Sequence, residues 1–170
     1  MSLLLPELDE LSRRVVPDCQ LEFIHGGFIG ASYLALHALV EQARVQRKRL
    51  YTAFVDVRRA FPSVYRALLF RKLDTQGASD SLLRALVSLY KETTGSVRSS
   101  AGLSKTFNIL QGTREGGVGG TLLYVLFVAY LIEFLQSVEP LDGPVLLDGK
   151  ATPALKFADD LPLSHILNEI

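Results

Sequence analysis

Three carboxylates in two distant segments are the residues of this chain whose types and spacing point most clearly to chemistry. Phe54-Val55-Asp56 ends an apolar run of strand-forming residues, and Phe157-Ala158-Asp159-Asp160 places two acidic residues after a second apolar run. If the fold brings these segments side by side, the carboxylates converge, and like charges at close range resist ionising together without a cation. Hard oxygen ligands suit Mg²⁺, which also binds substrate phosphates and water. The pattern therefore indicates two-metal phosphoryl or nucleotidyl transfer.

Each acidic segment also has an ordinary structural interpretation when it is taken by itself. An aspartate that ends a strand, as Asp56 does, is often a turn or helix cap, and Asp159-Asp160 is typical of a tight hairpin turn. The two segments together favour a metal site, because an apolar strand precedes each of them and a buried carboxylate needs a cation or hydrogen-bond donors.

Two further features can belong to such a site. Phe61 follows Asp56 at a strand-to-helix junction, where an aromatic residue ordinarily serves the core. Gln111-Gly112, followed by Arg114, forms a polar loop that can hold a nucleotide, because glycine lets backbone N–H groups approach phosphates. Structural roles are expected for the histidines, which lack metal-ligand spacing: His25, His37 and His165.

The elements that must position these residues include both helices and strands, and we expect an α+β fold. An amphipathic lead-in over 1–22 is interrupted by Pro6 and Pro17. Hydrophobic periodicity and turn residues then predict a glycine-rich turn at 25–30 and a helix over 31–47, whose apolar stripe is formed by Leu36, Val40 and Ala43. The predicted strands are 50–56, 97–99, 105–110, 145–147 and 155–157. The remaining predicted helices are 62–77, one from 79 or 80 towards 95, and 121–138.

Composition limits the class of protein. A chain of 170 residues fits one domain with its own core, and 48% hydrophobic with 21% charged residues is typical of a globular protein. Cys19 is the single cysteine, which excludes an internal disulfide and a cysteine-based zinc cluster. The N-terminal residues lack the basic and apolar regions of a signal peptide, so we expect an intracellular location, in the nucleus or the cytoplasm.

Charge is distributed unevenly along the chain. The formal net charge is zero, which is not the strongly basic balance expected of a nucleic-acid binder. Basic residues nevertheless gather in the first half, and they can contact a phosphate backbone or simply form solvated helix faces. They are Arg44, Arg47, Lys48, Arg49, Arg58, Arg59, Arg66, Arg71 and Lys72.

An uncharged run over 116–132 raises the question of a membrane span. Its apolar part begins at Leu122 and is stopped by Glu133, so it is too short for a bilayer. We therefore predict a buried core helix and no membrane association. A membrane or partner-binding role for the helix over 122–135 is the alternative.

Taken in order, these segments resemble the reverse transcriptase domain of non-LTR (LINE-type) retrotransposons, and the resemblance runs over 23–164. Residues 54–64 are similar to the family motif F-x-D-x-x-K-A-F-D-x-V. Residues 111–118 correspond to its G-x-R-Q-G loop, and Phe157-Ala158-Asp159-Asp160 corresponds to its Y/F-A-D-D box.

The resemblance implies a right-hand polymerase fold, with an antiparallel sheet, packed helices and no thumb. One partial reverse transcriptase domain would span 1–170, with a fingers-like lead-in over about 1–50 and a palm with inserted fingers elements over 51–170. It implies an RNA-directed DNA polymerase that uses Mg²⁺ or Mn²⁺. The implied partners are an RNA template, a DNA primer and deoxynucleoside triphosphates, with no membrane and no disulfide partner.

The resemblance also implies roles for single residues. Asp56 and Asp159 would be the main metal ligands, with Asp160 and the backbone carbonyl of Val57 completing the set. Phe61 falls where the family excludes a ribose 2′-hydroxyl. The residues that would contact the incoming nucleotide or the template are Gln111, Gly112 and Arg114.

Three departures from the family pattern favour the alternative of a catalytically inactive, reverse-transcriptase-like remnant. Val118-Gly119-Gly120-Thr121 stands where the family has Ser-Pro, and Pro162 follows the acidic box, where a strand needs backbone donors. The chain ends at Ile170, before a thumb. We therefore expect a truncated polymerase domain that is weakly active or inactive in isolation.

Overall fold

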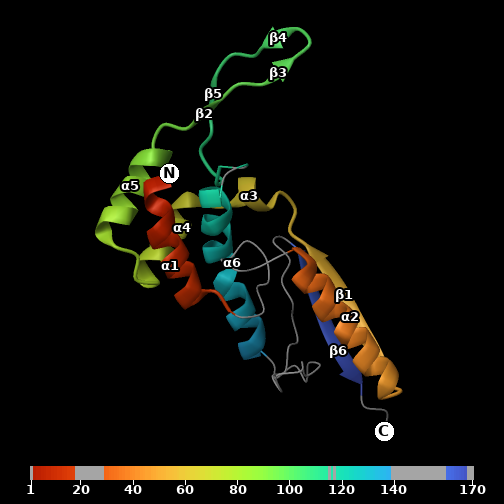
Figure 1. Cartoon of the computed structure of the whole chain (residues 1–170). Coiled ribbons are helices and arrows are strands. Elements are labelled where there is room, and N and C mark those ends of the chain that lie inside the picture. Colours follow the sequence, from red (N-terminus) through yellow and green to blue (C-terminus); the bar gives the residue numbers. More distant parts are fainter. Residues whose placement is uncertain (1, 18–28, 115, 117, 139–159, 168–170) are drawn as a thin grey trace.

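The computed structural model describes residues 2–17, 29–114, 116, 118–138 and 160–167, and it consists of a helical body, a projecting β-ribbon and a helix-covered sheet (Figure 1). The elements, in chain order, are η1 (Ser2–Leu4), α1 (Leu5–Val15), α2 (Ile29–Val45), β1 (Arg49–Asp56), α3 (Ala60–Ser63), α4 (Arg66–Thr75), α5 (Asp80–Tyr90), β2 (Thr94–Gly95), β3 (Arg98–Ser99), β4 (Gly102–Leu103), β5 (Phe107–Asn108), α6 (Val118–Val138) and β6 (Asp160–Leu167). The prediction of helices combined with antiparallel strands is confirmed.

The core of the helical body forms around α6. This helix is apolar on all sides over its first half, and residues 122–126 are buried, as expected of a helix that packs on several neighbours. Apolar residues of α1, α4 and α5 pack against it, and the fully buried ones include Leu8, Leu11, Leu69, Leu73, Leu82 and Leu86. The predicted core helix is therefore confirmed, and none of the described helices has the length and hydropathy to cross a membrane.

Polar contacts fix α4 against α6. The Lys72 ammonium donates to the Phe127 carbonyl oxygen at 2.7 Å and lies 4.5 Å from the Phe127 ring centroid. The Gln76 side-chain amide donates to the Leu126 carbonyl oxygen at 3.2 Å. Burial lowers the pKa of Lys72, as expected for an ammonium enclosed between two helices.

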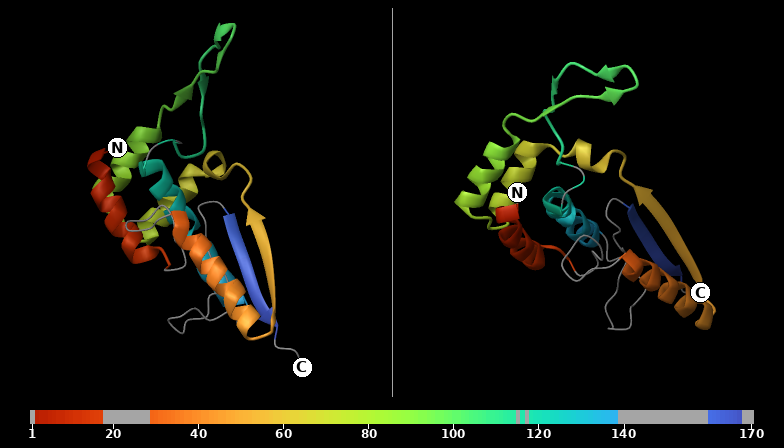
Figure 2. Two further views of the ribbon diagram at one scale, coloured as in Figure 1. Left: turned by 45° about the vertical axis from the view of Figure 1, so that its right-hand side comes forward. Right: turned by 45° about the horizontal axis from the view of Figure 1, so that its top comes forward.

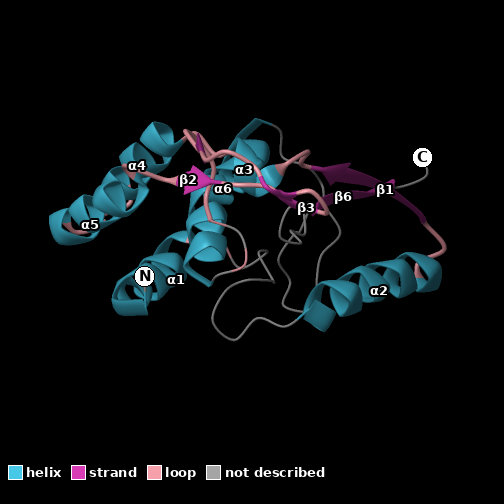
Figure 3. Ribbon diagram, turned by 90° about the horizontal axis from the view of Figure 1, so that it is seen from above, coloured by secondary structure: helices cyan, strands magenta, loops and turns pink. Residues whose placement is uncertain are grey.

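The sheet of β1 and β6 lies on the other side of α6 from α4 and α5 (Figure 3). The two strands pair antiparallel over their whole length, from Arg49 opposite Leu167 to Asp56 opposite Asp160. Pro162 lies inside β6 opposite Phe54, and the ladder continues on both sides of it although proline has no N–H to donate. α2 packs along this sheet and buries Leu39 and Ala43.

The structure corrects several predicted boundaries. Pro6 lies in the first turn of α1, where a proline is tolerated, so it starts the helix and does not interrupt the lead-in. The prediction of one helix over 62–77 is wrong, because Val64 and Tyr65 have extended backbones and separate α3 from α4. In α2, Val40 was expected on the apolar stripe but is half-exposed, and its neighbour Leu39 is the buried residue.

The β-arm (residues 94–108) also differs from its prediction. Instead of one hairpin of two longer strands, β2 pairs with β5 and β3 pairs with β4 in two short antiparallel ladders. The β-arm projects away from the helical body, as both views in Figure 2 show. Pro17 follows α1, which ends at Val15, so it lies beyond the helix and does not interrupt it. The strands predicted over 145–147 and 155–157, and the part of the glycine-rich turn before residue 29, lie outside the described residues.

Replacing Leu86 by alanine tests the core. Leu86 is fully buried, so we expect the free energy of unfolding to fall by about 2–5 kcal/mol through lost burial and cavity formation. Urea denaturation measures the change. Val87 is the matched control, because it is the next residue of α5 and 48% exposed, and its alanine variant should change stability by about 0.5 kcal/mol. Equal losses in both variants would contradict the assigned core.

Candidate functional site

The end of β1 is the first part of the candidate site. Asp56 is its last residue and pairs directly with Asp160, the first residue of β6. Direct cross-strand partners have Cα atoms about 4.5–5.5 Å apart. The requirement that the acidic segment near the C-terminus lies beside the end of the earlier strand is therefore met by the backbone of these two residues. Asp159 lies outside the described residues.

The side chain of Asp56 is exposed, and the chain turns sharply after it. Val57 is half-buried against the core, whereas Arg58 and Arg59 are exposed. Arg59 adopts a left-handed backbone conformation (φ 55°), which turns the chain from β1 into α3. Among the side chains that the structure describes, no three histidine, cysteine, aspartate or glutamate residues converge. The exposed carboxylate end of β1 is thus bordered by basic side chains that suit an anionic substrate.

The loop over 111–114 packs directly on α3. The Gly112 N–H donates to the Val64 carbonyl oxygen at 2.8 Å, and the Thr113 N–H donates to the Phe61 carbonyl oxygen at 3.0 Å. The break between α3 and α4 leaves the Val64 carbonyl free to accept this bond. Two segments that are distant in the sequence are thereby joined through their backbones.

Only glycine fits at position 112. Its φ is +88°, which L side chains rarely adopt, and a Cβ atom there would lie 2.8 Å from the Pro62 Cα and 3.1 Å from the Phe61 carbonyl oxygen. Glycine therefore allows a close approach of the loop to α3. This differs from the expected role of glycine, which was to let a phosphate approach the backbone.

The backbone N–H groups of this loop face the protein. Those of Gly112 and Thr113 donate to α3 and to the residue after it, and the Arg114 N–H donates to the Tyr90 hydroxyl at 3.3 Å. The sequence-based expectation that these groups approach phosphates is therefore wrong in this structure. The side chains of Gln111 and Arg114 are exposed, and they are the parts of the loop that a ligand can reach.

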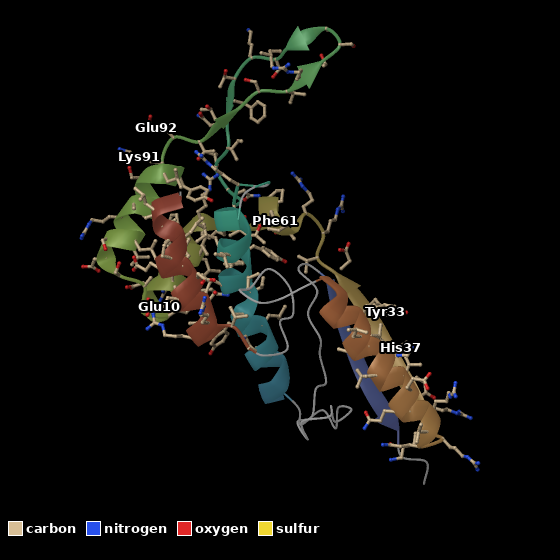
Figure 4. All side chains as sticks on the ribbon, in the orientation of Figure 1. Glu10, Tyr33, His37, Phe61, Lys91 and Glu92 are labelled. Atoms are coloured by element: carbon tan, nitrogen blue, oxygen red, sulfur yellow. The ribbon has the colours of Figure 1, made fainter. Side chains whose placement is uncertain are left out.

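Phe61 is a residue of α3, and its side chain packs against α6 (Figure 4). Its ring is half-buried, and its centroid is 4.8 Å from that of Tyr124, which is fully buried in α6. The structure thus brings the loop around Gly112 against Phe61, and Gln111 and Arg114 flank the contact in the sequence. Tyr124 was not predicted, because an aromatic residue in an apolar helix carries no separate signal.

Sequence reasoning also missed the contacts of Arg66. This residue begins α4, and its guanidinium binds the carbonyl oxygen of Gly112 at 2.8 Å. Burial has the largest effect on the pKa of Arg66 and lowers it; Tyr90 raises it, and the nearby charge of Arg114 lowers it. A positive charge at a helix N-terminus opposes the helix dipole. The sequence carried no signal of this conflict, because the predicted helix began at residue 62 and placed Arg66 inside it.

A groove of about 560 Å³ opens between α4, α5 and the base of the β-arm. Its lining includes Arg66, Phe70, Tyr90 and Ile109. None of Asp56, Phe61, Gln111, Gly112 or Arg114 lines it. The groove is therefore distinct from the candidate site, and both Arg66 and Tyr90 line it and also bind the loop over 111–114.

Replacing Gly112 by alanine tests the packing of the loop on α3. Gly102 is the matched control, because its φ is +109° but no atom lies within 4 Å of a Cβ there. Gly102→Ala should lower the free energy of unfolding by about 1–2 kcal/mol through backbone strain alone. Gly112→Ala should lower it by about 1–3 kcal/mol more through the clash with Pro62. Urea unfolding measures both, and equal losses would contradict the observed contact.

Comparisons with known proteins come from sequence and structure. No family model matches the chain. The sequence is 27% identical over 131 residues to the retrovirus-related Pol polyprotein from type-1 retrotransposable element R2 of Popillia japonica, which covers 76% of this chain and 18% of that protein. The chain thus spans less than a fifth of the length of that relative.

The structure is similar to that of apo telomerase from Candida tropicalis truncated from its C-terminal domain. The TM-score is 0.52 at 12% sequence identity, and the match covers 96% of this chain and 33% of the telomerase chain. At this identity the similarity concerns the fold alone. Together the two comparisons confirm the resemblance that the sequence motifs indicated.

Proposed function

From this resemblance to a reverse transcriptase domain, we propose that the chain is the fingers and palm portion of an RNA-directed DNA polymerase. The fingers-like part comprises about 1–50, and the palm with inserted fingers elements comprises 51–170. It acts on an RNA template and a DNA primer with deoxynucleoside triphosphates. The observation that carries the proposal is the register of β1 and β6, in which Asp56 is the direct partner of Asp160.

The proposed metal ligands are Asp56, Asp159, Asp160 and the carbonyl oxygen of Val57. The donor set fits Mg²⁺ or Mn²⁺, because all of its atoms are hard oxygens and Asp56 is exposed at the end of its strand. Cations held by these oxygens would supply activation of a primer 3′-hydroxyl and neutralisation of the charge on a triphosphate. The protein's part is to hold the backbones of Asp56 and Asp160 opposite each other on two paired strands.

The incoming nucleotide is proposed to bind beside α3. Phe61 limits the space at the ribose 2′-position, and its ring packs against the ring of Tyr124. Arg114 and Gln111 present exposed side chains that can bind phosphate and base, and the charge of Arg66 near Arg114 adds to the attraction for an anion. Gly112 contributes by letting the loop lie against Pro62.

The substituted loop sequence is compatible with this proposal. Where the related family has Ser-Pro, this chain has Val118-Gly119-Gly120-Thr121, and α6 nevertheless begins at Val118. A Cβ atom on Gly120 would collide with the Arg114 carbonyl oxygen, so glycine is required for this start of the helix. The alternative is a catalytically inactive remnant with the same fold, and primer extension separates the two.

Primer extension on an RNA template is the decisive test. We expect slow incorporation by the wild-type chain with Mg²⁺ or Mn²⁺, and a loss of about 100-fold or more in Asp56→Ala, because metal-assisted catalysis contributes several kcal/mol. Asp74→Asn is the matched control, since Asp74 is an exposed aspartate of α4. Undetectable extension by a folded wild-type chain would contradict the polymerase proposal and favour the remnant.

Metal binding can be measured without catalysis. Mn²⁺ at a hundredfold excess over its dissociation constant should stabilise the wild-type fold by about 2.7 kcal/mol through mass action. Asp56→Asn and Asp159→Asn should each remove most of that stabilisation, because each removes one proposed ligand. Thermal unfolding with and without Mn²⁺ measures it, with Asp74→Asn again as the control. Stabilisation that persists in both ligand variants would place the metal elsewhere.

A further inference from the structure

One guanidinium gathers four backbone carbonyls around the loop over 111–114. The Nε atom of Arg66 donates to Gly112 O at 2.8 Å, and Nη2 donates to Gln111 O at 3.2 Å. Nη1 donates to Ile109 O at 2.8 Å and to Tyr90 O at 3.2 Å. A single side chain at the start of α4 therefore hydrogen-bonds to the end of α5, to the residue after the β-arm and to the loop.

Tyr90 extends this contact to the other end of the loop. Its ring lies 4.8 Å from the Arg66 guanidinium carbon, an attractive cation–π geometry, and it is only 4% exposed. Its hydroxyl accepts the backbone N–H of Arg114 at 3.3 Å. Arg66 thus binds the carbonyls of residues 111 and 112 at the start of the loop and of residue 109 before it, and Tyr90 binds residue 114 at its end.

The position of Arg66 is unfavourable for a cation unless these partners compensate for it. The guanidinium is partly desolvated and stands at the N-terminus of its own helix, where a cation is disfavoured. Its contacts compensate for this, because hydrogen bonds from a charged donor are about twice as strong as neutral ones. The C-terminal carbonyl of α5 at Tyr90 also carries the negative end of that helix dipole.

Holding the carbonyls inward determines what the loop presents to a ligand. With the carbonyl oxygens of Gln111 and Gly112 directed to Arg66, and the N–H groups of 112–114 directed to α3 and Tyr90, the backbone of the loop has its hydrogen bonds inside the protein. The side chains of this loop that are exposed to a ligand are those of Gln111 and Arg114.

We propose that Arg66 and Tyr90 are positioning residues that preset the loop over 111–114 for the nucleoside triphosphate, with recognition through the side chains of Gln111 and Arg114. The proposal rests on the proposed nucleotide-binding function. Preorganisation of this kind strengthens binding because the loop does not lose conformational freedom when the ligand arrives.

The test compares Arg66→Gln, Arg66→Lys and Tyr90→Phe with Arg71→Gln, which alters an exposed arginine of the same helix. Amide hydrogen exchange followed by NMR reports the loop, and titration with a fluorescent deoxynucleoside triphosphate reports binding. Both Arg66 variants should raise exchange at Gly112 and Thr113 about tenfold or more and raise the nucleotide dissociation constant about tenfold. Arg66→Lys keeps the charge but cannot reach four carbonyls, so it separates geometry from charge.

Tyr90→Phe is the mildest variant, because it keeps the ring and removes only the acceptor for Arg114. It should raise exchange at Arg114 and leave the core amides of α6 unchanged, which excludes a general loss of stability. Arg71→Gln should change neither readout. If Arg66→Gln unfolds the chain, Tyr90→Phe still decides the question.

Two results would overturn the proposal: unchanged loop exchange in the Arg66 variants, or faster exchange with an unchanged nucleotide dissociation constant. A wild-type chain that binds no nucleotide would contradict the proposed function and the nucleotide role of Arg66 with it. In that case the exchange data still show whether Arg66 fastens the loop, so the two failures are distinguishable.

Discussion

Two backbone hydrogen bonds between the loop at 112–113 and the segment 61–64 are the contacts on which the candidate site depends. The segment follows directly after β1, so it is joined to the acidic end of that strand. The loop leads directly into α6, so it is joined to the core helix. Because these bonds form only when Gly112 lies against Pro62, one glycine couples the acidic strand end to the residues proposed to bind the nucleotide.

The pairing of β1 with β6 provides the second constraint. A shift of one residue in this register would move Asp56 away from Asp160 and reverse the face of every side chain in the shifted strand. The ladder is long, and α2 covers part of the sheet by burying Leu39 and Ala43. A long ladder that is covered on one face resists such a slip, which keeps the two aspartates as partners although many residues separate them.

The motif residues of the site could be predicted, whereas the residues that hold them could not. Phe61 and Gly112 lie in contact through α3, as their place in the motifs suggested. Arg66 and Tyr90 were missed because the partners of Arg66 are backbone carbonyls, which every residue possesses and no sequence pattern marks. The orientation of the loop N–H groups was misjudged for the same reason: it depends on acceptors supplied by α3 and α5.

The sequence by itself determined the helices of α2, α5 and α6, because apolar periodicity and caps such as Ser79, whose side chain accepts the Leu82 N–H, act within a few residues. It also placed Asp56 at the end of a strand, whereas the strand β6 that begins at Asp160 was not predicted. The tertiary structure decided the break between α3 and α4, the division of the β-arm into two ladders and the inward-facing loop. For the break and the loop, the physical reason is that their hydrogen-bond partners are remote in the chain, so local propensity cannot select among them. The partners within the β-arm are close in the chain, and several registers of a short polar ribbon satisfy the same local preferences.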